Sequence, residues 1–382
     1  MLRQITVEHR TPKIATAGVA VLAGPKKTPI PATLLAGIAT LTLLASTTAC
    51  SSDKKPNTPK INQPAPKTAA APAPVPSSTP QSPAPVAPPI SEAEAKTIAQ
   101  NYYDSSKKAK SSHDIAALDG IETGILLDIS KARQARIAKF GNNVQMTEEM
   151  ANTSEMQAAT PQSAPTGSDR WLLSIGLQKL GTDSRSSLGV LRQSQGEGPW
   201  KMSFLAFTES KKSLPSVTEI STVKGDGKGE IDYGDNICSD FSTGLSGGST
   251  SSNWGQSAKS TLQSEQGNKE KGITATRGGT VSVQTEPLAQ NRTPAWNTTD
   301  GGKLVMCSIK VTSNMTAGSA GSFTIDQSPT YENLSGRVTK WRSLTLTNVA
   351  MYAFKVPATP NGPIDLVASS TRPLNVDGAP VQ

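Results

Sequence analysis

The chain twice passes from apolar residues at helical spacing into runs typical of β-strands. The first such stretch opens at Ser91 and Glu94, which form a capping box that bonds the free backbone N–H groups of a helix start. An apolar stripe with helical periodicity follows. Glycines at 124 and 141 end two further predicted helices. The stripe consists of Ala95, Ile98, Ala99, Tyr102 and Ala109, and the later helices cover about 113–123 and 128–140.

Strand-like runs follow these helices. They cover 171–177, 188–191 and 200–207, and the glycine- and proline-containing segment 196–200 suits a hairpin turn. Residues 141–168 are polar, and we interpret them as a mobile excursion without regular structure. Trp171, Trp200 and Trp341 lie at strand positions and are expected to anchor the core.

The second stretch begins after Pro215 and repeats the order of helix before strands. A glycine- and serine-rich region (224–257) leads into a weak helix at about 257–266. The predicted fold is α+β, with N-terminal helices packed on an antiparallel sheet and two related α+β units in tandem, 91–214 and 215–382. The strands of the second unit are expected near 280–285, 303–312, 322–326, 341–356 and 364–369.

An export signal precedes both units. Residues 32–45 form an apolar run of about 14 residues, too short to span a bilayer and of the length of a signal-peptide core, and Lys26 and Lys27 stand before it. The segment from Ala45 to Cys50 resembles a bacterial lipoprotein cleavage box. That resemblance implies cleavage after Ala49, which makes 1–49 a signal peptide, and lipidation of Cys50.

Two other interpretations of this leader stay open. Thr47 occupies a position where the lipoprotein box usually has an apolar residue, and Thr47 with Ala49 also fits an ordinary signal-peptidase site, which would release a secreted protein. An uncleaved membrane anchor is the other interpretation, and the short apolar run argues against it.

A linker follows Cys50. Residues 51–90 hold 12 of the 28 prolines and few large apolar side chains, so this tract favours extended, unfolded chain. Forty residues in polyproline II reach about 120 Å. We therefore expect a tether that holds the folded part away from the membrane surface.

The basic residues lie mostly outside the folded part. The formal net charge is +8, of which the leader to residue 49 carries +4 and residues 51–90 carry +3, which leaves +1 for 91–382. A domain that binds nucleic acid needs a basic face on its folded part. Because 91–382 carries only +1, we expect no nucleic-acid binding. Lys54 and Lys55 would instead lie beside the membrane, each attracted to anionic lipid by about 1 kcal/mol.

Two cysteines remain in the body if Cys50 is lipidated. Cys238 and Cys307 form an even pair in an exported protein, which favours a disulfide over two buried free thiols.

Candidate catalytic and metal-binding residues are sparse. His113 is the one histidine after the leader, and beside Asp114 at a helix start we expect a surface or capping role. The acids of 226–235 fail the spacing of a calcium loop, so a solvated glycine-rich turn is the preferred interpretation. Those acids are Asp226, Glu230, Asp232 and Asp235. We expect no metal and no cofactor.

Two segments resemble a family of uncharacterised actinobacterial lipoproteins that combine a cleavage box, a proline-rich linker and an α+β domain. One runs from Asn101 to Gly124 and contains Leu118-Asp-Gly-Ile-Glu122-Thr-Gly124; the other is 346–357. The resemblance covers most of 91–370 and implies no assigned activity. Glu122 is the acid that stands out, with either a capping or pairing role among the helices or a general-acid role with an unidentified partner.

These features predict a non-enzymatic lipoprotein on the extracytoplasmic face of the cell membrane, with a binding or structural role in the envelope. Its expected partners are membrane lipid, through Cys50, and an envelope protein or cell-wall component. The alternative is an envelope hydrolase or transferase, which two carboxyl groups with raised pKa values in one pocket would support.

Overall fold

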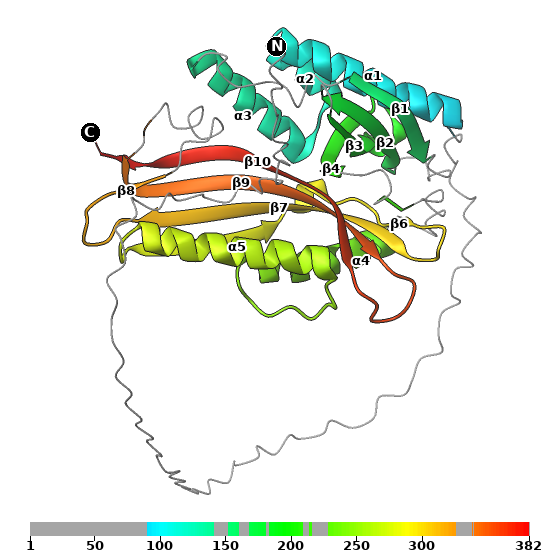
Figure 1. The fold of residues 1–382 in the computed structure, drawn as a ribbon. Coiled ribbons are helices and arrows are strands. Elements are labelled where there is room, and N and C mark those ends of the chain that lie inside the picture. Colours follow the sequence, from blue (N-terminus) through cyan, green and yellow to red (C-terminus); the bar gives the residue numbers. More distant parts are fainter. Residues whose placement is uncertain are drawn as a thin grey trace, which may run out of the picture. The chain divides into compact units, whose positions relative to one another are not determined.

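The computed structural model describes residues 90–140, 152–159, 168–180, 183–208, 214–215, 228–325, 338 and 340–381. These residues form α-helices and one ten-stranded antiparallel sheet, so the α+β prediction is confirmed (Figure 1). Ala49, Cys50 and the proline-rich tract lie outside the described residues, as do Met1 and the rest of the leader.

The first helix begins where the capping box predicts. Ser91 Oγ accepts a hydrogen bond from the Glu94 backbone N–H at 3.2 Å, and α1 runs from Glu92 to Ser111. Its stripe of small and aromatic residues, including Ala95 and Tyr102, is buried. Two shorter helices follow, α2 (Ile115–Ile121) and α3 (Gly124–Phe140), and α3 begins four residues earlier than the sequence indicated.

Four strands complete the first half. The hairpin predicted around 196–200 is present, with a short 3₁₀ turn (Ser194–Gly196) inside it. The interpretation of 141–168 as irregular is wrong for its middle, because β1 pairs there with β2 at the edge of the sheet. Met156 and Ala158 of this edge strand pack against the core. The strands are β1 (Asn152–Ala159), β2 (Arg170–Leu180), β3 (Asp183–Gln193) and β4 (Lys201–Thr208).

The glycine-rich region of the second half contains a helix where the sequence indicated a solvated turn. Helix α4 runs from Lys228 to Leu245, so the expected turn at Glu230, Asp232 and Asp235 is wrong. Burial of its apolar face, centred on Phe241, outweighs the low helix propensity of its glycines. Helix α5 (Gln256–Ala275) confirms the weak helix and extends it by nine residues beyond 266.

The strands of the second half are long and form a continuous ladder. Strands β7 and β9 pair without a register shift from Lys303–Val356 to Thr316–Ser343. The order across the whole sheet is β1-β2-β3-β4-β10-β9-β7-β5, with β6 beside β7 and β8 beside β9. The bounds are β5 (Thr280–Pro287), β6 (Trp296–Asn297), β7 (Lys303–Thr316), β8 (Phe323–Thr324), β9 (Lys340–Val356) and β10 (Asp365–Pro380).

The disulfide joins α4 to this ladder. Cys238 of α4 and Cys307 of β7 are bonded, with their Cα atoms 5.4 Å apart. The predicted pairing is therefore confirmed, and the free-thiol interpretation is wrong.

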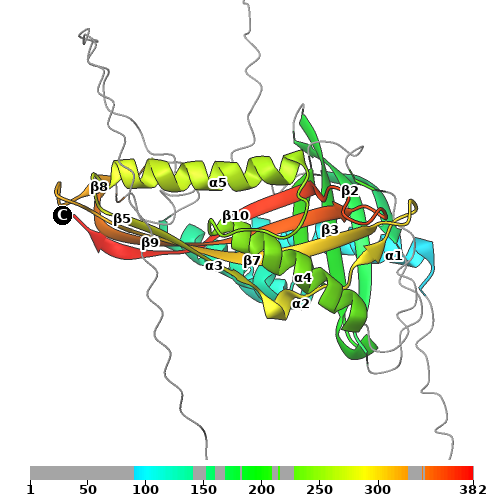
Figure 2. The same ribbon diagram turned by 90° about the horizontal axis from the view of Figure 1, so that it is seen from below.

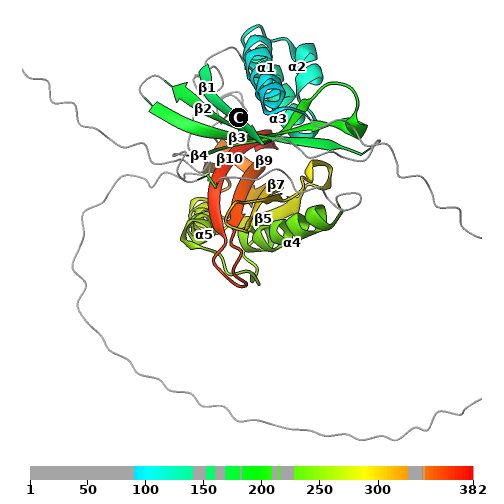
Figure 3. The same ribbon diagram turned by 90° about the vertical axis from the view of Figure 1, so that its right-hand side faces the viewer.

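The two halves meet through one strand pair and a shared core. Strand β4 pairs with β10 at Phe207 and Ser369. One buried cluster combines side chains of α1, α3 and β2 to β4 with Met306 and Met351. These two methionines lie on the face of β7 and β9 that is turned away from α4. Helices α1 to α3 lie on one side of the strands and helices α4 and α5 on the other (Figure 3).

Candidate functional site

Glu122, the acid that the sequence singled out, lies in the protein interior. Its side chain is fully buried, and Oε1 accepts hydrogen bonds from Lys110 Nζ at 2.9 Å and from the Tyr102 hydroxyl at 3.1 Å. Burial lowers the pKa of Lys110, against the opposing charge of Glu122, and burial raises the pKa of Tyr102 well above its usual range. The pairing role predicted for Glu122 is confirmed, and neither of the two pockets described below includes it.

The other residues considered for chemistry are dispersed. His113 is exposed, and its Nδ1 lies 2.9 Å from Gln134 Oε1. Asp235 forms an ion pair with Arg292 at 2.9 Å, while Asp226 falls outside the described residues. No group of three or more potential metal ligands occurs within the described ranges. Of the three tryptophans that were expected to anchor the core, Trp341 is buried, whereas Trp171 and Trp200 are half-buried beneath Arg192 and Arg170.

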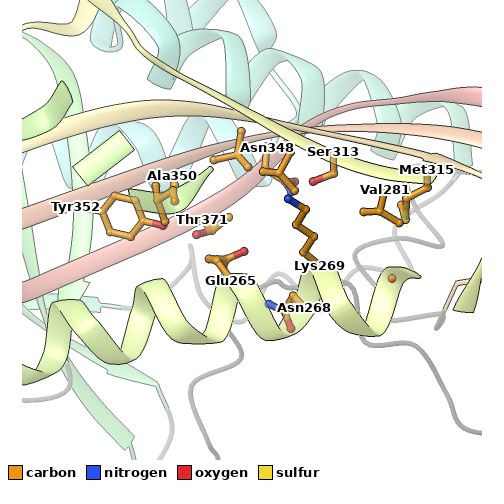
Figure 4. Close-up of a pocket in the computed structure, with 14 residues that line it drawn as sticks. Glu265, Asn268, Lys269, Val281, Ser313, Met315, Asn348, Ala350, Tyr352 and Thr371 are labelled. Carbon is orange, nitrogen blue, oxygen red and sulfur yellow. The ribbon is translucent and has the colours of Figure 1, made fainter. Parts of the chain in front are cut away.

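A pocket lies between α5 and the sheet (Figure 4). The empty space within and in front of it totals about 650 Å³, which includes open solvent, and only a small part of that space is enclosed. Its floor comes from β5, β7, β9 and β10, which present alternate side chains toward α5. The apolar part of the floor is Val281, Val283, Val311, Met315 and Ala350.

Charged and polar groups lie among these apolar side chains. Glu265 and Lys269, one helical turn apart, both point from α5 toward the sheet (Figure 4). Burial raises the pKa of Glu265, although a hydrogen bond with Asn268 opposes the change. Burial also raises the pKa of Tyr352 on the floor, and the charge of Glu265 adds to that effect. Asn348 and Ser313 line the pocket near Lys269 (Figure 4).

Lys269 has no acidic partner in this pocket. Among the described residues, no ion pair joins its ammonium group to any carboxylate. Glu265, although one turn away, points toward Tyr352 and Thr371 instead (Figure 4). The pocket therefore combines an apolar floor with an unpaired cation and a carboxyl group that burial drives toward its neutral form.

A second pocket lies beside the disulfide. Cys238 and Ser239 of α4 line it together with the short turn after β5 (Ala289–Asn291) and β7. Its charged residues are Asp235 and Arg292, which already pair with each other. Burial raises the pKa of Asp235, against the charge of Arg292. This pocket mixes polar and apolar side chains, and its two charged residues compensate each other.

The chain belongs to the family described as Domain of unknown function (DUF8094), whose model matches residues 86–377. The uncharacterised-family part of the sequence-based resemblance is thereby confirmed. None of the curated proteins matches the chain. Throughout the described ranges, each helix is too short or too polar to cross a bilayer.

Sequence inspection missed the pocket residues of this DUF8094 chain. Glu265 and Lys269 were within or beside the predicted weak helix, but a helix with so few apolar residues gives no sign of which face meets the sheet. The available signal was the spacing of Ala350 and Tyr352, which lie two residues apart in the predicted strand 341–356 and therefore on one face of it. The sequence of the strand alone does not tell which helix covers that face.

Proposed function

We propose that this chain is an exported, lipid-anchored protein of the cell envelope, of the actinobacterial lipoprotein type, whose folded part has a non-enzymatic binding role. Lipid on Cys50 would hold it at the extracytoplasmic face of the membrane. The proline-rich tether of about 40 residues would let the folded part reach a ligand or an envelope partner away from the bilayer.

The export part of this proposal rests on the leader and gains support from the disulfide. Disulfides persist in oxidising compartments and are rare where cellular thiols are kept reduced. The bond between Cys238 and Cys307 suits a protein that folds outside the cytoplasm. The leader supplies an apolar run and small residues directly before Cys50.

The pocket beneath α5 is the observation that carries the binding role. Pockets that bind small molecules are mainly apolar with a few placed polar groups, and this pocket has that composition. A hydrolase of the carboxylate type needs two acids that act on one bond. Each of the two pockets in the described part contains one carboxyl group with a raised pKa, Glu265 in the first and Asp235 in the second.

Mass spectrometry of the mature N-terminus tests the anchor. The expected result is a diacylglycerol-modified Cys50 as the first residue, with the Cys50→Ala chain recovered unmodified as the matched control. An unmodified mature terminus at or near residue 50 in the parent chain would contradict lipid anchoring and indicate a secreted protein.

Crosslinking in intact cells tests the binding role. The tethered protein is expected to recover one consistent envelope component, and the recovery should fall when the pocket is blocked by Ala350→Phe. Recovery of nothing, together with hydrolysis of an envelope substrate by the purified chain, would favour the enzymatic alternative.

A further inference from the structure

Helix α5 runs alongside the long strands of the sheet (Figures 1 and 2), and hydrogen bonds attach the chain to neighbouring segments near both of its ends. Near its start, Gly255 N–H donates to the Ile364 carbonyl at 2.8 Å, and Leu366 N–H donates to Ser257 Oγ at 3.0 Å. Just past its end, the Thr276 carbonyl accepts from Gly318 N–H at 2.8 Å. These attachments hold both ends against the strands.

Small residues let the helix approach the sheet only near those ends. Of the twenty residues of α5, Ala258 and Gly272 are the ones that are buried. An added β-carbon on Gly272 would lie 3.4 Å from Val281. Between these points, the longer polar side chains of Glu265 and Lys269 separate the helix from the floor (Figure 4). The pocket is therefore a consequence of the pattern of residue sizes along α5.

The space between helix and floor suits a single apolar chain. Its floor of valine, methionine and alanine offers aliphatic contact along the direction of α5, and its mouth is open to solvent. Val281 and Met315 lie farther toward the end of α5 than Lys269 does (Figure 4). A ligand with its polar end beside Lys269 would place its apolar part over these two side chains.

The charged residues of the pocket indicate which kind of head group the ligand carries. Lys269 has no carboxylate partner among the described residues, whereas burial favours the neutral form of Glu265. An anionic head group would pair with the ammonium group of Lys269. Asn348, which lines the pocket near Lys269, would supply an amide donor to the same head group.

We infer that the pocket binds a single-chain amphiphile, with its acyl chain on the apolar floor beneath α5 and its anionic head group on Lys269. This inference rests on the proposed binding role and names the ligand class. A carboxylate and a phosphate monoanion share the chemistry that Lys269 recognises, so a fatty acid and a lysophospholipid are both members of this class.

The test measures binding to the full chain in its Cys50→Ser form, without detergent, because detergents would compete for the pocket. The probes are dodecanoate, lauroyl-lysophosphatidylglycerol and dodecanol, titrated by calorimetry. We expect one site for at least one of the two anionic probes. We also expect Lys269→Gln to weaken anionic binding about tenfold, as the loss of a charge-assisted hydrogen bond does, and to leave dodecanol unchanged.

Lys271→Gln is the matched control, since Lys271 lies on the same helix but is exposed and does not line the pocket. This variant should bind all three probes as the parent does. Absence of binding by both anionic probes, or equal weakening by Lys269→Gln and Lys271→Gln, would overturn the inference. Preference for one anionic probe supports it and identifies the head group.

A photoreactive dodecanoate gives an independent measurement that depends on no variant. Its crosslinks are expected on peptides that contain Val283, Val311 or Met315. Crosslinks confined to other regions would overturn the inference. The proposed envelope role is decided separately, by the mature terminus at Cys50 and by the partners recovered from cells, so failure of lipid binding leaves those two results intact.

Discussion

The Gly124 backbone packs directly against the side chain of Asn291, so closely that a β-carbon at residue 124 would overlap Asn291 Oδ1. Asn291 comes from the second half of the chain. Its Oδ1 accepts from Ile125 N–H at 2.9 Å, and its Nδ2 donates to the Ser203 carbonyl at 2.7 Å. With Ser308 Oγ 3.3 Å from Nδ2, one buried side chain connects α3, β4 and β7.

Gly124→Ala is therefore expected to destabilise the protein by about 2–4 kcal/mol. The substitution places a side chain at a φ of +59° and displaces the buried amide of Asn291, and each of these effects costs on the order of 1–3 kcal/mol. Urea unfolding followed by circular dichroism measures the change.

Gly120→Ala is the matched control in the same short segment. A β-carbon there has no neighbour within 4 Å, and residue 120 lies inside α2, so alanine should be neutral or stabilising by up to about 1 kcal/mol. Equal unfolding midpoints for the two variants would show that the contact between Gly124 and Asn291 carries little energy.

The ion pair between Lys110 and Glu122 is expected to show strong coupling. Both side chains are almost fully buried, so Glu122→Gln or Lys110→Met alone leaves an uncompensated interior charge and should cost about 3–5 kcal/mol. The double variant should lose much less than the sum, because it removes both charges. A double-mutant cycle of unfolding free energies measures this.

The exposed pair of Glu92 and Lys96 on α1 is the comparison for this cycle. Their nitrogen and oxygen atoms are 2.6 Å apart, but the side chains are 70% and 41% exposed. Glu92→Gln should leave the unfolding midpoint nearly unchanged, because solvent screens this exposed pair. A coupling energy for the buried pair as small as that of the exposed pair would contradict its structural role.

Local signals in the sequence predicted much of the fold. The cap at Ser91, the hairpin glycines around residue 196 and the apolar strand run within 341–356 each act over a few residues, and the structure contains all three. The pairing of Cys238 with Cys307 was accessible for another reason, since it needed only a cysteine count and the export context.

The features that the sequence did not reveal depend on contacts between residues that are far apart in the chain. Helix α4 has a glycine-rich sequence, and its stability comes from packing against β7 through residues such as Phe241. Strand β1 is polar because it lies at a sheet edge with one paired neighbour. The pocket required knowing that α5 covers Ala350 and Tyr352, which no short stretch of sequence records.

The disulfide should account for a large share of the stability of the second half. It closes a sequence separation of 69 residues, which on the chain-entropy model stabilises the fold by about 4 kcal/mol. We expect reduction to lower the unfolding free energy by about that amount in the Cys50→Ser chain, in which no third thiol can exchange. Unfolding in oxidised and reduced samples, with thiol labelling of each, checks the prediction. Labelling of two thiols in the unreduced, unfolded chain would refute the bond.

Asp240 is expected to control stability at acid pH. It organises the turn between α4 and α5, where Oδ1 accepts from Ser251 N–H at 2.6 Å and Oδ2 accepts from Ser252 N–H at 3.0 Å and Trp254 Nε1 at 3.1 Å. Partial burial raises the pKa of Asp240, but the hydrogen bonds from Ser251 and Ser252 together outweigh that effect and lower the pKa below the usual 3.8.

The sign of the pH effect follows from this depressed pKa. The unfolded chain takes up the proton first as pH falls, so the stabilisation is complete above the unfolded pKa near 3.8 and is lost as pH falls through the folded pKa. Asp240→Asn should cost about 1–3 kcal/mol at pH 7, because its amide group faces donors that the carboxylate oxygen accepted. Its stability should also decline less steeply below pH 4 than that of the parent.

Ser251→Ala is the graded comparison, since it removes the hydroxyl donor 2.9 Å from Asp240 Oδ1 and retains the backbone donors. Its loss of stability at pH 7 should be smaller than that of Asp240→Asn. The steepness with which its unfolding free energy declines below pH 4 should lie between those of the parent and that variant. Urea titrations at pH values between 2.5 and 7 measure all three chains. If the parent and Asp240→Asn lose stability in parallel below pH 4, other carboxylates control the acid limb and the turn at Asp240 contributes through its geometry alone.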